Sequence, residues 1–160
     1  MVAVKNLPAL LAEHAFTQDL DADALAVLAG CAQNVRFRPD QSIFREGGRA
    51  DWFYLLRRGT VALEMPIPGR GRTTIQTIRQ GDILGVSWLF PPYRWNFDAR
   101  AVTETGAIAF DAACLRGKCD ADPALGYALM RRFAPYVSQR LQAARLQLAD
   151  LYGDPNAAAG

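Results

Sequence analysis

The stretch that decides the fold is Gly81-Asp-Ile-Leu-Gly85, which leads into an aromatic loop running from Val86 to Asp98. Short apolar runs separated by turn residues extend in both directions from it, at intervals of about 8–12 residues. Examples are Phe53-Tyr-Leu-Leu56, Val61-Ala-Leu-Glu-Met65 and Ile108-Ala-Phe110. No segment between these runs is long enough for the helix of a parallel crossover. The pattern predicts an antiparallel jelly roll or β-roll over about residues 34–111.

Helical periodicity flanks this β region on both sides. Residues 8–32 mix apolar and acidic positions at helical spacing, which predicts two short helices, the second capped near Asp21. After the β region the pattern predicts a short helix from Ala112 to Cys119. Asp122-Pro123 then opens a long helix over about residues 123–152. We therefore expect a mainly β fold with N-terminal helices and a long C-terminal helix.

The long helix carries an apolar seam. Its positions alternate between spacings of four and three residues, as in a coiled coil, and are Met130, Ala134, Val137, Leu141, Ala144, Leu148 and Leu151. We expect this seam to form a homodimer; the alternative is a helix that lies only on its own domain. A second stripe, Leu125, Leu129 and Phe133, would face the β-roll. Four arginines of this helix are expected in solvent: Arg131, Arg132, Arg140 and Arg145.

The composition suits a single domain. A chain of 160 residues, 51% of them apolar, can bury one ordinary core, which we place over residues 1–152 with a flexible tail over residues 153–160. No apolar run approaches the ~20 residues of a membrane span, so we expect a cytoplasmic protein. The net charge is only +2, with basic residues scattered among 16 acids, and predicts no dedicated nucleic-acid surface.

The cysteines and the histidine give no sign of metal or covalent chemistry. Cys31, Cys114 and Cys119 have neither disulfide-framework nor ligand spacing, which favours buried thiols in a reducing compartment. An iron–sulfur cluster normally needs about four thiolates, one more than the chain has. His14, the only histidine, is expected to be a solvated or capping residue. No serine lies in a recognisable triad motif, so we expect a non-enzyme.

Four features follow one another along the chain. They are Phe37-Arg-Pro-Asp-Gln-Ser-Ile-Phe-Arg-Glu-Gly47, Phe53-Tyr-Leu-Leu-Arg-Arg-Gly-Thr-Val61, the Gly81–Gly85 stretch and the final helix. In this order they resemble the cyclic-nucleotide-binding domain of the catabolite-activator superfamily, over roughly residues 10–151. The resemblance implies a regulatory β-roll with cyclic AMP or cyclic GMP as the possible ligand.

In that family the segment after the second glycine is a phosphate-binding cassette, in which the amides of Gly85, Val86 and Ser87 would face the phosphate. The family has a glutamate directly after the glycine and an arginine about nine residues later. This chain has Val86 and Trp95 at those positions, and Asn96 at the small hydroxyl position that follows. Losing two charged hydrogen bonds costs about 3–6 kcal/mol, or at least about a hundredfold in affinity.

Five aromatic residues fall within ten positions of this cassette, and two interpretations follow. In the first, the cassette binds a flatter or more hydrophobic ligand, with Arg94 and Asn96 as polar contacts and aromatic rings stacking on it. In the second, the rings fill the nucleotide cavity and the domain docks a protein partner. The candidate ligand-binding residues are Gly85, Val86, Ser87, Trp88, Arg94, Trp95, Asn96 and Phe97.

The sequence thus predicts a dimeric regulatory or sensor module, or alternatively an interaction subunit without a ligand. Transcription factors of the superfamily follow the long helix with a helix-turn-helix domain. This chain stops at Gly160, so we expect no DNA binding by this chain alone. The sensor half of a transcription regulator is a less favoured alternative.

Overall fold

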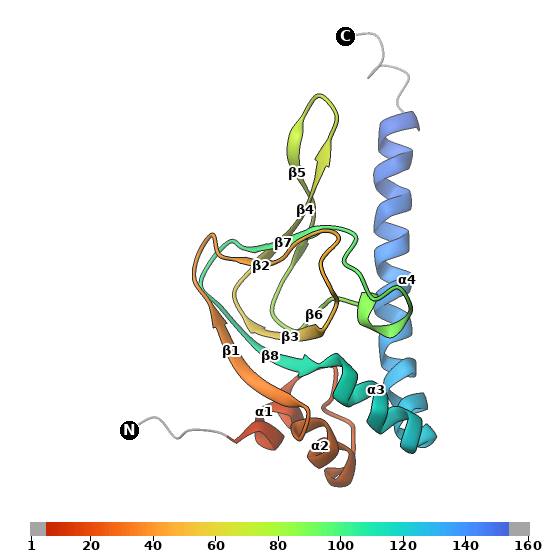
Figure 1. Ribbon diagram of the computed structural model, residues 1–160. Helices are drawn as coiled ribbons and strands as arrows, with labels where there is room; N and C mark the ends of the chain where they lie inside the picture. The colour runs from red at the N-terminus through yellow and green to blue at the C-terminus, as the bar shows by residue number, and fades with distance from the viewer. Residues whose placement is uncertain (1–5, 154–160) are drawn as a thin grey trace.

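The computed structural model describes residues 6–153 and shows a β-roll of two four-stranded antiparallel sheets (Figure 1). The first sheet has the order β1 (Ala32–Phe37), β8 (Thr105–Asp111), β3 (Trp52–Arg58) and β6 (Ile83–Leu84). The second has the order β2 (Ser42–Phe44), β7 (Asp98–Ala101), β4 (Val61–Ile67) and β5 (Gly71–Ile78). The predicted fold class is confirmed, and the roll begins at Ala32, two residues before the predicted start.

The core lies between the sheets and also behind the first one. In β7, Ala99 and Ala101 are buried whereas Arg100 between them is half-exposed, the period of two expected of a half-solvated sheet. In β3, the four consecutive residues Phe53-Tyr-Leu-Leu56 are all buried. Helices pack against the outer side of this strand, because Phe53 contacts Phe133 of the C-terminal helix at 5.4 Å between ring centroids. The strand β3 is therefore buried on both faces.

The turn between β3 and β4 depends on glycine. Gly59 has a φ of +89°, and a Cβ there would lie 2.5 Å from the carbonyl oxygen of Glu104. Only glycine takes this left-handed conformation with the neighbouring chain so close.

The helices begin where the sequence predicts. In α2 (Ala22–Ala29) the Asp21 carboxylate accepts a hydrogen bond from the Ala24 amide at 2.8 Å. The helix α1 (Leu7–Glu13) precedes it, and α3 (Ala112–Ala121) follows β8. The helix α4 (Pro123–Gly153) opens with Asp122, whose carboxylate accepts from the Leu125 amide at 3.3 Å. Residues 154–160 of the predicted tail lie outside the described residues.

Figure 1 shows α1, α2 and α3 gathered at one end of the β-roll and α4 running along its side. The first part of α4 buries the predicted stripe of Leu125, Leu129 and Phe133. The second part attaches by hydrogen bonds to backbone carbonyls: Tyr136 Oη donates to Gly81 at 3.3 Å, and Gln147 Nε2 to Ile75 at 2.9 Å. Across residues 6–153, no helix combines the length and apolar character needed to cross a bilayer.

Arg140 contradicts the expectation that the α4 arginines stay in solvent. Its Nη2 donates to the carbonyl of Ile83, and its Nη1 is buried with no hydrogen-bond partner in the described part of the chain. Burial lowers the pKa of Arg140, and the charge of Asp82 opposes this shift. The long side chain lies under α4 because the helix passes directly over β6, a contact that no local pattern reveals.

Two of the three cysteines form a disulfide, so the prediction of three buried thiols was wrong. Cys31 and Cys114 are joined, with their Cα atoms 5.7 Å apart. Cys31 directly precedes β1 and Cys114 lies in the first turn of α3, after β8. Because β1 and β8 pair with Ala32 opposite Phe110, their ends place the two cysteines together. Cys119 is free and half-buried.

His14 is buried, which contradicts the expectation of a solvated residue. Its Nε2 lies 2.9 Å from the Leu56 carbonyl oxygen, and its Nδ1 accepts from the Phe16 amide at 3.1 Å. These contacts require the neutral ring with its proton on Nε2. Burial lowers the pKa of His14 below 6.5, outweighing the hydrogen bond to Leu56 that raises it. The ring thus fastens the end of α1 to β3.

Candidate functional site

The cassette spans Gly85–Asp98, between β6 and β7, and contains the short helix η1 (Ser87–Leu89). Its second half runs beside the Arg45–Ala50 loop as a short ladder. The Trp95 amide donates to the Gly48 carbonyl at 3.0 Å, and the Gly47 amide donates to the Trp95 carbonyl at 2.9 Å. The Ala50 amide donates to Tyr93 at 2.7 Å. Both the amide and the carbonyl of Trp95 are therefore hydrogen-bonded to the Arg45–Ala50 loop.

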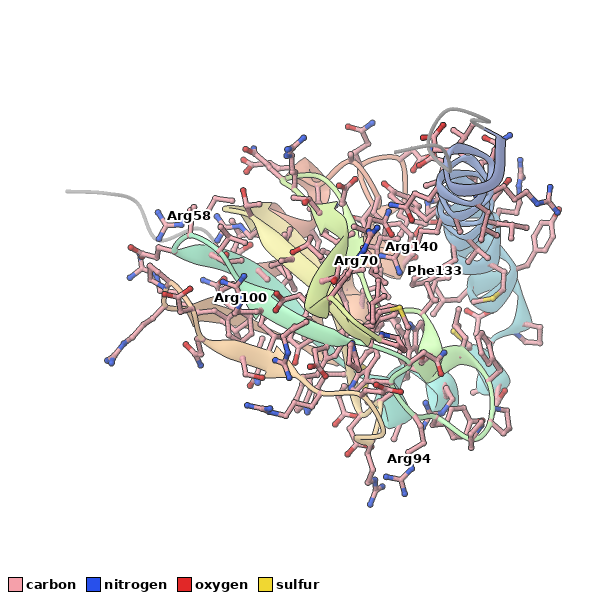
Figure 2. All side chains as sticks on the ribbon, turned by 90° about the horizontal axis from the view of Figure 1, so that it is seen from above. Arg58, Arg70, Arg94, Arg100, Phe133 and Arg140 are labelled. Carbon is pink, nitrogen blue, oxygen red and sulfur yellow. A yellow bond between two sulfur atoms is a disulfide. The ribbon has the colours of Figure 1, made fainter. Side chains whose placement is uncertain are left out.

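This ladder decides which cassette side chains face the interior of the β-roll. Successive side chains of an extended segment point to opposite faces. Trp95 is buried, whereas its neighbours Arg94 and Asn96 are exposed. Arg94 Nη1 donates to the Gly47 carbonyl at 3.2 Å, and Figure 2 shows its side chain pointing away from the β-roll. The two predicted polar contacts thus lie on the opposite face from the predicted stacking ring.

Trp95 fills the space behind the second glycine of Gly81–Gly85. Its ring stacks on Phe44 of β2, with centroids 3.8 Å apart and planes 7° apart, and only 4% of Trp95 is exposed. The edge of the ring presses on Gly85, where a Cβ would lie 2.6 Å from Cη2 and 2.8 Å from Cζ3. Gly85 has a φ of +101°, so the position needs glycine for both conformation and space. Phe97 is half-buried against Phe44 at 6.1 Å.

Trp88 points into a different part of the core. It stacks on Phe53 at 4.4 Å and meets Phe133 of α4 edge-on at 5.5 Å between ring centroids. Its neighbour Ser87 is buried, and Val86 is half-buried. The structure therefore brings Gly85 and Trp95 together, and places Trp88 on the side of the cassette that faces α4.

Charged side chains brace the rim of the cassette. The buried Asp98 carboxylate accepts from the Glu46 amide at 2.8 Å and pairs with Arg72 at 2.9 Å. On the neighbouring strand, the buried Glu64 pairs with Arg100 at 3.0 Å, and this contact raises the pKa of Arg100. Sequence reasoning missed Phe44 and Asp98 because their contacts join segments about fifty residues apart. Within residues 6–153, no group of three or more histidine, cysteine or acidic residues could hold a metal ion.

A β-roll with a glycine-led cassette and a long helix along its side defines a cyclic-nucleotide-binding fold. The sequence profile of the family described as "Cyclic nucleotide-binding domain" matches residues 34–122, more than half of the chain. The chain belongs to this family, and its class is that of a regulatory binding domain.

A curated relative is the CRP-like cAMP-activated global transcriptional regulator of Mycobacterium tuberculosis, 29% identical over 143 residues. The match covers 89% of this chain and 62% of the relative, so the chain spans less than two thirds of that protein. A solved protein of Geobacter metallireducens named for cyclic-nucleotide binding is 30% identical, with a TM-score of 0.75 over 88% of this chain and 99% of that one. The catabolite activator protein of Thermus thermophilus shares the fold, with a TM-score of 0.68, 21% identity, and coverage of 86% and 62%.

Proposed function

We propose that this chain is a homodimeric regulatory module whose nucleotide position is occupied by its own Trp95. The observation that carries the proposal is the packing of the Trp95 ring between Phe44 and Gly85, with 4% of the residue exposed. A nucleotide would have to displace this ring. Exposing a large buried aromatic side chain costs about 3 kcal/mol, which weakens apparent affinity about a hundredfold.

The missing anchors act in the same direction. Val86 and Trp95 stand where the family resemblance implies a glutamate and an arginine, and Arg94 lies on the outer face of the ladder. A one-residue slip that brought Arg94 inward would turn Trp95 out and break both backbone hydrogen bonds of Trp95. Arg94 is thus a poor substitute for the lost arginine.

The alternative of a flat apolar ligand at the cassette needs a free face on Trp95. One face already stacks on Phe44, the ring edge contacts Gly85, and only 4% of the residue is exposed, so no open face remains. We therefore favour the filled cavity, with regulation exerted through contacts with another protein. The proposal assigns no catalytic residue.

The dimer part of the proposal rests on α4. Its seam residues Met130, Val137, Leu141 and Leu148 are all exposed large apolar side chains in the single chain. A partner helix in a coiled coil would remove these apolar side chains from water. The side chain of Leu151, the last seam position, lies outside those described.

Calorimetric titration with cyclic AMP and cyclic GMP tests the filled cavity. The wild-type protein should show no binding tighter than about 100 μM. The double variant Val86→Glu, Trp95→Arg should bind at least about a hundredfold more tightly, because it restores two charged hydrogen bonds. Trp95→Phe is the matched control. It keeps an aromatic ring stacked on Phe44, so it should bind cyclic nucleotides no more tightly than the wild-type protein does.

Binding of either nucleotide to the wild-type protein with a Kd below about 100 μM would overturn the proposal. If the double variant melts too low to measure, Trp95→Ala opens the cavity without adding a charge. Its failure to bind any more tightly than wild type would show that Trp95 is not what excludes the nucleotide.

A further inference from the structure

A cavity of about 360 Å³ is lined by residues of the cassette, α3 and α4. The cassette contributes Trp88, Leu89 and Tyr93 to its wall, α3 contributes Arg116 and Asp120, and α4 contributes Met130. This volume is at the lower end of the range for small-molecule sites, so an occupant would be small. Neither Trp95 nor Gly85 lines it, so the cavity is distinct from the nucleotide position.

Arg116 is a charged residue of the cavity wall whose guanidinium is held in position by two contacts. Its Nη1 donates to the Trp88 carbonyl at 2.6 Å, and its Cζ lies 4.2 Å from the centroid of the Tyr93 ring. Within the described residues Arg116 has no carboxylate partner, although Asp120 lies one turn later on α3. A guanidinium has five N–H donors. The stacking on Tyr93 fixes the plane of the group and leaves donors for a ligand carboxylate.

The remaining wall has two kinds of surface. Leu89 and Met130 are apolar, whereas the exposed carboxylate of Asp120 is an acceptor for a cation. The indole N–H of Trp88 is buried and has no hydrogen-bond partner in the described part of the chain. Burial and the charges of Asp120 and Asp122 raise the pKa of the neighbouring Cys119 thiol, which therefore stays neutral.

We propose that the cavity binds a small zwitterion of the amino-acid class with an apolar side chain. The ligand carboxylate would pair with Arg116, its ammonium would face Asp120, and its side chain would pack against Leu89 and Met130. The Asp120 carboxylate would repel the negative charge of a phosphate, so a phosphate ester is a poor candidate. Met130 is also the first residue of the seam, so an occupant would contact both the cassette and the dimer helix.

Titration with L-phenylalanine, followed by tryptophan fluorescence and calorimetry, tests this assignment. Binding should weaken at least about tenfold in Arg116→Gln and in Asp120→Asn. It should weaken similarly for 3-phenylpropanoate, which lacks the ammonium, and for 2-phenylethylamine, which lacks the carboxylate. Arg131→Gln is the matched control and should change nothing, because Arg131 also lies over a tyrosine ring, that of Tyr127 at 5.7 Å, but lines no wall of this cavity.

Two results would overturn the proposal: no binding of L-phenylalanine, L-leucine or L-methionine up to about 10 mM, or equal affinity in wild type and Arg116→Gln. The inference goes beyond the proposed function and can fail separately from it. Cyclic-nucleotide titrations report on Trp95 and should be unaffected by Arg116→Gln, whereas amino-acid titrations should be unaffected by Trp95→Phe.

Discussion

Replacing Leu141 with glutamate should weaken the proposed homodimer. Leu141 lies in the middle of the seam and is 52% exposed in the single chain. Full burial of a leucine side chain contributes about 1.5–3 kcal/mol, so covering the exposed half contributes about half of that in each copy. Because a dimer contains two Leu141 side chains, replacing both should weaken dimerisation by about 1.5–3 kcal/mol, which raises the dissociation constant about 10–150-fold. Two glutamates facing each other across the seam would add repulsion.

Sedimentation equilibrium over a range of protein concentrations measures this change directly. The matched control is Leu146→Glu, the same substitution on the same helix at a leucine that is 67% exposed and lies outside the seam. It should leave the dissociation constant within about twofold of wild type. A monomeric wild-type protein, an unchanged dimer in Leu141→Glu, or equal dissociation in both variants would refute the reasoning.

Three further predictions concern the single chain. Reducing the disulfide between Cys31 and Cys114, which are 83 residues apart, should lower the free energy of unfolding by about 4–5 kcal/mol. Urea unfolding with and without reductant measures this loss, and an unchanged midpoint would contradict the bond. Because burial lowers the pKa of His14 below 6.5, the unfolded chain binds more protons below that pH. Stability should fall as the pH drops through 6.5, and His14→Gln should remove this dependence; equal pH profiles would argue against it. Gly85→Ala should cost about 2 kcal/mol or more, given a φ of +101° and the contact with Trp95. Combined with Trp95→Ala its cost should be smaller than the sum, and strict additivity would reject the contact.

Local patterns predicted the features that depend on neighbours in the chain. The caps at Asp21 and Asp122 need only a side chain within three residues of a helix start. The disulfide is different, because Cys31 and Cys114 meet only through the register of β1 on β8. His14 likewise lies against β3 through a contact between residues 42 positions apart. Such features require the fold to be known first.

The cassette shows the same division. Its glycines and aromatic residues predicted a site with two possible states, a cavity open to a ligand or a cavity filled by the chain's own rings. The choice between an open and a filled cavity depends on Phe44, which stacks on Trp95 from another strand. The outward direction of Arg94 depends on the ladder with Gly47 and Gly48. Alternation along an extended segment tells which side chains share a face, but not which face points inward. That becomes known only when the direction of one of its side chains is known.

The two parts of α4 are held to the β-roll by different interactions, and this difference matters for signalling. Phe133 is fully buried and belongs to the core, so the first part cannot leave the roll without unfolding it. Beyond Phe133, the attachments seen within the described residues are the edge-on contact of the Tyr136 ring with Phe16 and the hydrogen bonds of Tyr136, Arg140 and Gln147 to backbone carbonyls. Each such bond contributes about 1 kcal/mol net, a difference that a dimer contact or a ligand can offset. The acceptors used by Tyr136 and Arg140 are the carbonyls of Gly81, just before β6, and of Ile83, its first residue. Movement of this part of α4 would break hydrogen bonds two to four residues before Gly85, so the proposed dimer helix and the cassette share a set of bonds through which each can influence the other.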